Sequence, residues 1–370
     1  MNMNDINKKL NEIYDTEAPD FKGLINIKDI ILYGAGSLGE MAINILRDNG
    51  IKPKYIADKL KTGYLKDIKI LNPAYIDIDD KYNSLFINCI STISRNEIEN
   101  YLKSLGCKNI IHFYNYVYLR FPNILSNGWF VSDISDKTKQ QILKVCENLS
   151  HDETSINHYI QFLYEKLKVK EVINPNFPVL SKKKYFGSPI FPKLKNNEVL
   201  LDLGADRGQT IESFIQATDN NFKNIHAFEP NTKSYNYLID NYKDKRIIID
   251  NRVIHNIDGF VNFKEDIGGG LASKIFAGDN NIKKSITIDS LDINPTIIKL
   301  HIEGNELKAL LGATKTIEKC NPIIMVLADH NEDGLFKIAN FLYNLTNYKL
   351  YFNLHDYVGN SAVFYAVPNN

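Results

Sequence analysis

Residues 198–210 read Glu-Val-Leu-Leu-Asp-Leu-Gly-Ala-Asp-Arg-Gly-Gln-Thr, and this stretch decides the fold. Val199–Leu201 is a continuous apolar run, which is typical of a strand covered on both faces. Gly204 and Gly208 then flank a tight turn before a helix that begins near Thr210. Ligands of open α/β sheets bind where strands end, and glycine lets a ligand approach the backbone closely. The stretch predicts a strand–turn–helix unit with a ligand at the turn; a turn without a ligand is the alternative.

Strands and helices alternate across the C-terminal half of the chain, as they do in a parallel α/β sheet. The predicted strands after the first one cover residues 224–228, 246–250, 297–302, 323–328, 349–354 and 362–367. The short loop 355–361 joins the last two, which favours an antiparallel hairpin at the edge of the sheet. We therefore expect an α/β domain over residues 195–370.

The N-terminal part shows the same alternation over a shorter length. Apolar runs predict strands at 29–33, 54–57, 85–89 and 109–113, with helical segments at 40–49 and 94–105. Between the two α/β regions, helical spacing at 136–149 and 156–167 is followed by a proline-rich stretch at 175–192. The sequence thus predicts a small Rossmann-like domain at residues 1–119, a helical and loop-rich linker at 120–194, and the second domain from residue 195.

The composition narrows the class of protein. At 370 residues the chain is too long for one ordinary core and suits two domains. Basic and acidic residues number 44 each, so no basic field favours nucleic acid or a membrane surface as a partner. The polar first residues, the lack of a membrane-length apolar run and four cysteines without a CxxC pair favour a cytoplasmic protein with reduced thiols. The sequence leaves open whether the chain forms a homo-oligomer.

An acidic residue after the second strand of the C-terminal domain bears on the kind of ligand. Glu229 lies about twenty residues beyond the glycine turn, where a carboxylate is placed to accept the hydroxyls of a ribose. A dinucleotide-binding turn has a central glycine for the close approach of the pyrophosphate, whereas this chain has Asp206 there. The two residues together favour an adenosine group without phosphates.

A series of sequence blocks between residues 195 and 330 carries a family resemblance. They read LDLGADRGQT, HAFEPN, VIHNIDGFVNF, TIDSL, IIKLHIEGNELKALLGA and NPIIMV. In these blocks the chain resembles the FkbM family of methyltransferases. The resemblance implies a class I methyltransferase fold that uses S-adenosylmethionine, usually on a hydroxyl of a sugar or natural product.

The resemblance also implies which residues hold the cofactor. The loop under the methionine and ribose would consist of Asp202, Gly204, Ala205, Asp206, Gly208 and Thr210. The ribose hydroxyls would bind to Glu229, with Asn231 beside it, and the adenine would lie against the segment from Asn251 to Val253.

One block departs from the family pattern where catalysis is expected. The family usually has aspartate at the position that His301 occupies in this chain. His301 and Glu303 are two residues apart, so both face the same way on an extended segment at the end of the fourth strand. Asp329 and His330 end the next strand and should lie nearby. We therefore expect these four residues beside the methyl donor.

Three roles are open for this set. His301 is a candidate base for the hydroxyl proton, because histidine titrates near neutral pH. Alternatively, some of His301, Glu303, Asp329 and His330 hold a divalent metal ion that lowers the pKa of the alcohol. Such a donor set suits Mn, Fe or Zn better than Mg alone, and we expect Mn or Mg to support activity. In the third interpretation Glu303 caps the helix that begins near Asn305, and His301 has no chemical role.

The N-terminal domain carries a nucleotide-binding pattern of its own. Gly34, Gly36 and Gly39 form G-x-G-x-x-G directly after a strand, and Asp58 follows the second strand. Backbone N–H groups at such a helix N-terminus can hold a phosphate. The stretch resembles Rossmann-like domains attached to some sugar-modifying bacterial enzymes, including sugar acetyltransferases that hold a nucleotide-sugar there. It is a site for the nucleotide of such a sugar, a dinucleotide site, or a docking module whose glycines serve only the turn.

These features predict an S-adenosylmethionine-dependent O-methyltransferase for a sugar hydroxyl. The expected substrate is a nucleotide-activated sugar for a bacterial surface polysaccharide, such as capsule or lipopolysaccharide. The alternatives are a nicotinamide-dependent oxidoreductase of sugar metabolism, which lacks a clear catalytic motif in the N-terminal domain, and a non-catalytic binding protein. His226, inside a strand, is interpreted as a packing residue, and Gly268–Gly270 as a flexible loop rather than a flap.

Overall fold

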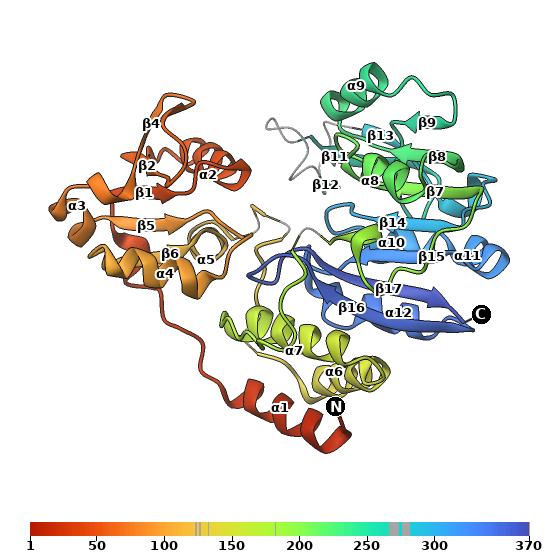
Figure 1. Ribbon diagram of the computed structural model, residues 1–370, viewed down its shortest axis with the longest axis horizontal. Helices are drawn as coiled ribbons and strands as arrows, with labels where there is room; N and C mark the ends of the chain where they lie inside the picture. The colour runs from red at the N-terminus through yellow and green to blue at the C-terminus, as the bar shows by residue number, and fades with distance from the viewer. Residues whose placement is uncertain are drawn as a thin grey trace.

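The computed structural model describes residues 1–122, 124–125, 127–131, 133–181, 183–265, 274–275 and 282–369. The chain folds into two α/β units, one at each end of the sequence, with a helical layer packed against the second (Figure 1). Most strand pairs in the two main sheets are parallel. The predicted α/β class with two Rossmann-like sheets is confirmed.

The N-terminal unit is built on a six-stranded sheet. Its strands are β1 (Ile30–Tyr33), β2 (Tyr55–Ala57), β3 (Gly63–Leu65), β4 (Ile68–Leu71), β5 (Leu85–Asn88) and β6 (Asn109–His112), and its helices are α2 (Ser37–Asp48), α3 (Ile78–Asn83), α4 (Arg95–Ser104) and α5 (Phe113–Arg120). The strand order is β3-β4-β2-β1-β5-β6, and β3 pairs antiparallel with β4. Helices α2 and α5 cover one face and α4 the other, so both faces are buried.

The C-terminal unit is built on a seven-stranded sheet whose centre holds the stretch quoted first. Its strands are β7 (Glu198–Leu203), β8 (Phe222–Phe228), β9 (Ile247–Asp250), β14 (Ile297–Leu300), β15 (Ile323–Leu327), β16 (Tyr348–Leu354) and β17 (Ala362–Pro368). They lie in the order β16-β17-β15-β14-β7-β8-β9, and β17 runs antiparallel to both of its neighbours. The order reverses between β7 and β14, so a crevice opens at the carboxyl ends of these strands.

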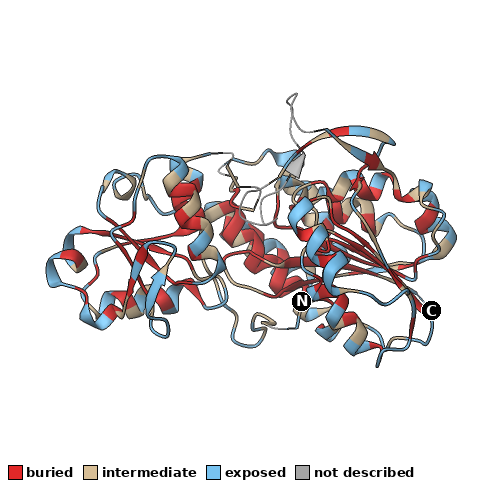
Figure 2. Cartoon of the chain, turned by 90° about the horizontal axis from the view of Figure 1, so that it is seen from above, coloured by how far each residue is buried: buried red, intermediate tan, exposed pale blue. Residues whose placement is uncertain are grey.

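Helices cover both faces of the large sheet. On one face lie α8 (Gln209–Ala217) and α9 (Thr232–Asn241). On the other lie α6 (Asp136–Leu149), α7 (Glu153–Lys168), α10 (Glu306–Leu311), α11 (Thr314–Cys320) and α12 (Lys337–Tyr343). Short 3-10 helices occur at Leu24–Asn26, Pro73–Tyr75, Tyr185–Gly187, Ile288–Ser290 and Glu332–Gly334. Buried residues are concentrated in the strands of both sheets and in helix α7 (Figure 2).

The first helix, α1 (Met3–Asp15), packs with the C-terminal unit, although it begins the segment predicted as the N-terminal domain. Ile6, Leu10 and Ile13 form one apolar stripe at helical spacing, and all three are buried against α6 and α7. The predicted linker helices α6 and α7 share this core with β16. The helical segment is therefore a layer of the C-terminal unit and not a free connection.

A small second sheet that the sequence did not predict lies between β9 and β14 in the chain. Its strands are β10 (Val253–Ile254), β11 (Gly259–Lys264), β12 (Lys274–Ile275) and β13 (Ile282–Ile286), in the order β10-β13-β11-β12. Val253, Val261 and Phe263 form its apolar cluster. Gly268–Gly270, interpreted above as a flexible loop, lies outside the described residues.

The predicted hairpin of the last two strands is present, and its loop also joins the two units. Val358, within this loop, is buried in the apolar core of the N-terminal unit. The Tyr357 backbone N–H donates to the Ser91 carbonyl at 2.8 Å, and the Asn360 amide donates to the Tyr114 hydroxyl at 2.9 Å. A buried ion pair of 2.8 Å between Arg95 on α4 and Glu165 on α7 adds a second connection.

Most predicted strands agree with the observed ones to within two residues, and one difference affects the site. The strand predicted at 297–302 ends at Leu300, because Glu303 and Gly304 have φ of +52° and +100° and the chain turns there. The four cysteines are free, as expected. Among the helices of the described residues, none has the length and apolar character needed to cross a membrane.

Candidate functional site

A cavity of about 650 Å³ lies between the two units. From the C-terminal unit it is lined by residues that follow β7, β8 and β14, and from the N-terminal unit by Ser37, Leu38, Met41, Ser91 and Thr92. Ser37 follows β1, and Ser91 and Thr92 follow β5, where the strand order of the small sheet reverses. The crevices of both sheets, where ligands of such folds bind, therefore open on one cavity.

The C-terminal glycine turn, residues 204–208, forms one wall of this cavity. Gly204 has φ of +80°, and a Cβ atom there would lie 1.9 Å from the carbonyl oxygen of His301. Gly208 has φ of +84° and a Cβ would lie 2.2 Å from the Tyr242 hydroxyl. Ala205, Asp206 and Thr210, also predicted to hold the cofactor, line the cavity. Both glycines are thus required for the turn, and its backbone is open to a ligand.

Asp202 lies beneath this turn and is fully buried. Its carboxylate forms a 2.8 Å ion pair with the ammonium of Lys299, which stands beside it on the neighbouring strand β14. Lys299 also donates to the Gly204 carbonyl at 2.7 Å. Asp202 therefore holds the cation that fixes the turn, and the side chain that reaches the cavity wall is Lys299.

Glu229, after β8, is buried and lines the cavity. One carboxylate oxygen accepts the Asp206 N–H and the other accepts the Asn231 N–H, both at 2.8 Å. Burial raises the pKa of Glu229 to about 7, although these two N–H groups act to lower it. A ligand that donates hydroxyls to this carboxylate would favour its ionised form.

The other residues predicted around the adenosine have different surroundings. Asn231 is buried and caps α9, where its side chain accepts the N–H groups of Lys233 and Ser234. Val253 lines the cavity. Asn251 is exposed and lies outside the cavity lining.

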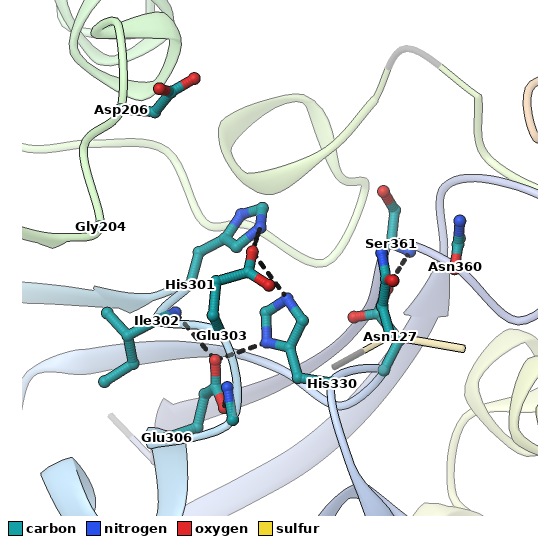
Figure 3. A network of polar contacts seen from close by, with 12 residues as sticks. Asn127, Gly204, Asp206, His301, Ile302, Glu303, Glu306, His330, Asn360 and Ser361 are labelled. Atoms are coloured by element: carbon teal, nitrogen blue, oxygen red, sulfur yellow. Dashed lines mark hydrogen bonds and ion pairs between the residues drawn. The ribbon is translucent and has the colours of Figure 1, made fainter. Parts of the chain in front are cut away.

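His301, Glu303 and His330, here called the histidine cluster, converge after the ends of β14 and β15, beside the C-terminal glycine turn (Figure 3). Both Nε2 atoms face the same carboxylate oxygen, Oε1 of Glu303, at 3.7 Å from His301 and 3.5 Å from His330. The other ring nitrogens have their own partners. Nδ1 of His330 lies 2.6 Å from Oε1 of Glu306, and Nδ1 of His301 lies 3.2 Å from the Tyr185 hydroxyl.

The two imidazoles differ in their tendency to carry charge. Burial, together with the positive charges of Lys184 and Lys299 and of His330, lowers the pKa of His301 well below its usual range. Burial also acts to lower the pKa of His330, but the carboxylates of Glu306 and Glu303 raise it to about 10. Without a ligand, His301 is therefore neutral at neutral pH and His330 carries a positive charge.

Asp329 lines the same cavity but does not converge with the histidine cluster. It is buried, and one carboxylate oxygen accepts the backbone N–H of Ser361 at 2.8 Å. Its backbone carbonyl accepts the indole N–H of Trp129 at 3.0 Å. These contacts connect the end of β15 with the loop between β16 and β17 and with the segment that precedes α6.

The third interpretation required Glu303 to cap the helix that follows His301, and Glu303 does not do so. Asn305 precedes α10 without a side-chain cap, and the carboxylate of Glu306 accepts the N–H groups of Ile302 and Gly304 at 2.8 and 3.0 Å. Glu303 instead faces the two imidazoles. Glu306 thus holds the turn that leads into α10, and Glu303 lies in the cavity wall.

The N-terminal glycine turn, residues 34–39, has the predicted geometry. Gly34 has φ of +108°, and a Cβ on Gly39 would lie 2.1 Å from the Gly34 carbonyl oxygen. Gly36 begins α2 without a side-chain cap, and the next residue, Ser37, lines the cavity. Asp58 accepts the backbone N–H groups of Ala35, Leu60 and Lys61 at 2.8 to 2.9 Å. Asp58 thus fixes the turn and lies outside the cavity lining.

The sequence interpretation missed Lys299, Tyr185 and Glu306. Lys299 had a signal, because a lysine inside the apolar strand Ile-Ile-Lys-Leu needs a buried partner and Asp202 ends the neighbouring strand. Glu306 had a weaker one, as an acidic residue at the start of a helix. Tyr185 comes from the proline-rich stretch, where no periodicity indicates which side chain points inward.

Comparison with known proteins agrees with the geometry. The sequence profile described as the methyltransferase FkbM domain matches residues 202–350. No curated protein sequence matches the chain. Among solved structures, methyltransferase FkbM from Methylobacillus flagellatus KT is similar over 99% of this chain and 100% of its own, with a TM-score of 0.66 and 16% identity. That likeness confirms the class I methyltransferase fold and covers both units.

Two other methyltransferases are similar over smaller parts of the chain. They are precorrin-6y C5,15-methyltransferase from Geobacter metallireducens GS-15 (15% identity, 47% of this chain, 80% of that chain, TM-score 0.28) and the SAH-bound methyltransferase PaMTH1 from Podospora anserina (11% identity, 65% of this chain, 99% of that chain, TM-score 0.29). At these TM-scores neither bears on the site.

Proposed function

Because residues 202–350 form an FkbM methyltransferase domain, we propose that this methyltransferase uses S-adenosylmethionine to methylate a sugar hydroxyl. The observation that carries the proposal is the shared cavity. The C-terminal glycine turn and Glu229 occupy one wall, and the histidine cluster follows the next strand of the sheet. A cofactor site and a polar reaction site are thus adjacent.

The residues of the C-terminal glycine turn fit the cofactor. The turn presents backbone because a Cβ at Gly204 would collide with the His301 carbonyl, and Lys299 holds it from below. Glu229 keeps a buried carboxylate on the cavity wall, which suits the two hydroxyls of a ribose. Val253 supplies an apolar contact for an adenine on the same wall.

The reaction needs few catalytic groups. When bound, the cofactor supplies a methyl group: a bond forms from the hydroxyl oxygen to the methyl carbon, the carbon–sulfur bond breaks with its electron pair kept on sulfur, and the hydroxyl proton leaves to a base or to water. The protein has to orient the hydroxyl and assist the loss of its proton. The histidine cluster is adjacent to the turn, since the Gly204 backbone abuts the His301 carbonyl.

The proposed acceptor is a sugar carried on a nucleotide. The N-terminal glycine turn starts α2 at the cavity, where backbone N–H groups favour a phosphate. Lys184 and Arg252 also line the cavity; burial lowers the pKa of Lys184 to about 8, and Arg252 forms an ion pair with Asp250. We place the reaction in the cytoplasm, on a precursor of a bacterial surface polysaccharide.

Two measurements test this proposal. Calorimetry with S-adenosylhomocysteine should show binding to the full chain, and radiolabelled S-adenosylmethionine with a panel of nucleotide sugars should yield a methylated sugar with the label on oxygen. Failure to bind S-adenosylhomocysteine would refute the methyltransferase proposal. Transfer to a free sugar as fast as to its nucleotide form would refute the nucleotide-linked acceptor, and NADH titration by fluorescence should show no saturable binding.

A further inference from the structure

We propose that the histidine cluster is a binding site for a divalent metal ion, with His301, Glu303 and His330 as ligands. The role that we assign to the ion rests on the proposed function, whereas the binding of the ion does not. Each of the three side chains offers one ligand atom, and these three atoms all lie within 4.8 Å of one another. Two imidazoles and a carboxylate suit Mn²⁺, Fe²⁺ or Zn²⁺ better than Mg²⁺.

The distances within the cluster fit ligands around an ion better than a hydrogen-bonded set. The two Nε2 atoms lie 3.5 and 3.7 Å from Oε1 of Glu303, beyond the usual hydrogen-bond range of about 2.7–3.2 Å. Metal–ligand bonds of about 2.0–2.2 Å place neighbouring ligand atoms roughly 3.0–3.6 Å apart. The two Nε2–Oε1 distances therefore lie within a few tenths of an ångström of that separation, and all three ligand atoms lie within 4.8 Å of one another.

The contacts of the two imidazoles outside the cluster resemble those of histidine ligands in metal sites. In such sites the second nitrogen of each imidazole usually bonds to a carboxylate, a carbonyl or another polar group, which fixes the ring. Here Nδ1 of His330 contacts Glu306 at 2.6 Å, and Nδ1 of His301 contacts the Tyr185 hydroxyl at 3.2 Å. Glu306 is itself fixed by the N–H groups of Ile302 and Gly304. Both Nε2 atoms are thereby left to face Glu303.

The backbone at Glu303 gives a further reason. Its φ of +52° places a non-glycine residue in the left-handed region, which costs about 1 kcal/mol or more. The following residue, Gly304, has φ of +100°, and its carbonyl is held by the Asn331 side chain at 2.9 Å. This strained turn brings the Glu303 carboxylate between two imidazoles that come from different strands. Glu303 and Glu306 place two carboxylates beside His330, and their negative charge favours a cation here; an ion bound to Nε2 would displace the proton of that nitrogen.

The position of the cluster indicates the role of the ion. All three ligands line the cavity, and the Gly204 backbone that abuts His301 belongs to the cofactor turn. Three protein ligands leave coordination positions for a substrate oxygen. An ion here would orient the acceptor hydroxyl toward the methyl donor and lower its pKa, so that the proton leaves to water.

Mn²⁺ binding to the full chain tests the site without an activity assay. After EDTA treatment and gel filtration, titration with Mn²⁺ followed by electron paramagnetic resonance should show a single tight site. We expect His330→Gln and Glu303→Gln to weaken Mn²⁺ binding by more than about 100-fold, since ligands matter more than their outer partners. His226→Gln is the matched control, because His226 lies on β8 outside the cavity lining and should bind Mn²⁺ as the wild type does.

The outer contacts give a second, milder test. Tyr185→Phe removes only a hydroxyl and should weaken Mn²⁺ binding by about 10-fold, at the low end of the range for outer partners. A wild-type chain that takes up no Mn²⁺, or a His330→Gln chain that binds Mn²⁺ as tightly as wild type, would overturn the metal site.

Calorimetry with S-adenosylhomocysteine on the same preparations separates this inference from the proposed function. Cofactor binding without Mn²⁺ binding refutes the ion alone. Mn²⁺ binding that depends on the histidine cluster, without cofactor binding, supports the site and refutes the methyltransferase proposal.

Discussion

The two glycine turns of this molecule share a layout and differ in what surrounds them. Each follows the first strand of its sheet, and each has an acidic residue after the second strand that accepts an N–H of its own turn at 2.8 Å, Asp206 to Glu229 and Ala35 to Asp58. Both open on one cavity. However, Glu229 lines that cavity, whereas the second oxygen of Asp58 accepts two more backbone N–H groups.

The strand pairs beneath the turns differ as well. Two residues before Gly204 lies Asp202, paired with Lys299 on the next strand, and two residues before Gly34 lies Leu32, paired with Ile87. The C-terminal turn is thus supported by a buried ion pair and the N-terminal turn by an apolar pair. A glycine pattern alone therefore does not distinguish a cofactor-binding turn from another turn. The orientation of the acidic residue, Glu229 or Asp58, and the residue on the neighbouring strand, Lys299 or Ile87, are more informative.

The largest expected effect comes from the ion pair beneath the C-terminal turn. Lys299→Met leaves the Asp202 carboxylate buried without its cation, which should lower the free energy of unfolding by about 3–5 kcal/mol. Urea unfolding measures this change. The double variant Asp202→Leu/Lys299→Met imitates the Leu32–Ile87 pair and should recover most of the stability. A Lys299→Met chain as stable as wild type would contradict the role of the pair.

The next effect separates the two turns by their glycines. Gly204→Ala places a Cβ 1.9 Å from the His301 carbonyl at φ of +80°, so affinity for S-adenosylhomocysteine should fall by about 100-fold, or about 2.8 kcal/mol. Gly36→Ala is a mild change in the other turn, because nothing lies within 4 Å of the added Cβ. It should leave cofactor affinity unchanged by calorimetry. Equal losses in the two variants would remove the distinction between the turns.

The two acids should differ in pH dependence. Ribose hydroxyls donate to an ionised carboxylate, so cofactor binding favours the ionised form of Glu229, whose pKa is about 7 in the free protein. Affinity should be constant above pH 8 and about tenfold weaker at pH 6. Glu229→Gln should weaken binding by about 10- to 30-fold at pH 8 and abolish this dependence. Asp58→Asn should lower stability but keep both the affinity and its pH profile.

The smallest effect concerns the acceptor at the N-terminal turn. Ser37→Glu adds a negative charge at the start of α2, next to the cavity, and should lower kcat/KM for a nucleotide sugar by about fivefold through repulsion of its phosphates. Affinity for S-adenosylhomocysteine should not change, and Ser37→Gln is the uncharged control. An unchanged kcat/KM in the glutamate variant would favour a docking role for the N-terminal unit.

The sequence predicted the two sheets well because buried parallel strands leave continuous apolar runs such as Val199–Leu201. It also indicated that His301, Glu303 and His330 lie near one another, since strand ends meet at one edge of a sheet. It could not show that Glu303 turns back at a positive φ between the imidazoles, or that Asp329 faces the Ser361 N–H instead. Such details depend on tertiary contacts.

The small sheet from β10 to β13 and the packing of α1 were also beyond the sequence. The strands of that sheet are two to six residues long, and their alternation is too brief to distinguish from a loop. The amphipathic pattern of α1 predicts a buried face but not its partner. Tyr185 reaches His301 from a stretch whose course is set by tertiary packing alone.

The loop between β16 and β17 makes the chain indivisible. Val358 fills a place in the N-terminal core, and Tyr357 and Asn360 bond to Ser91 and Tyr114. A truncation that kept only residues 195–370 would leave this loop without its partner and would strip α1, α6 and α7 from the sheet. Proteolytic dissection or domain exchange should therefore cut this protein into insoluble pieces, and chimeras should exchange the loop together with the N-terminal unit.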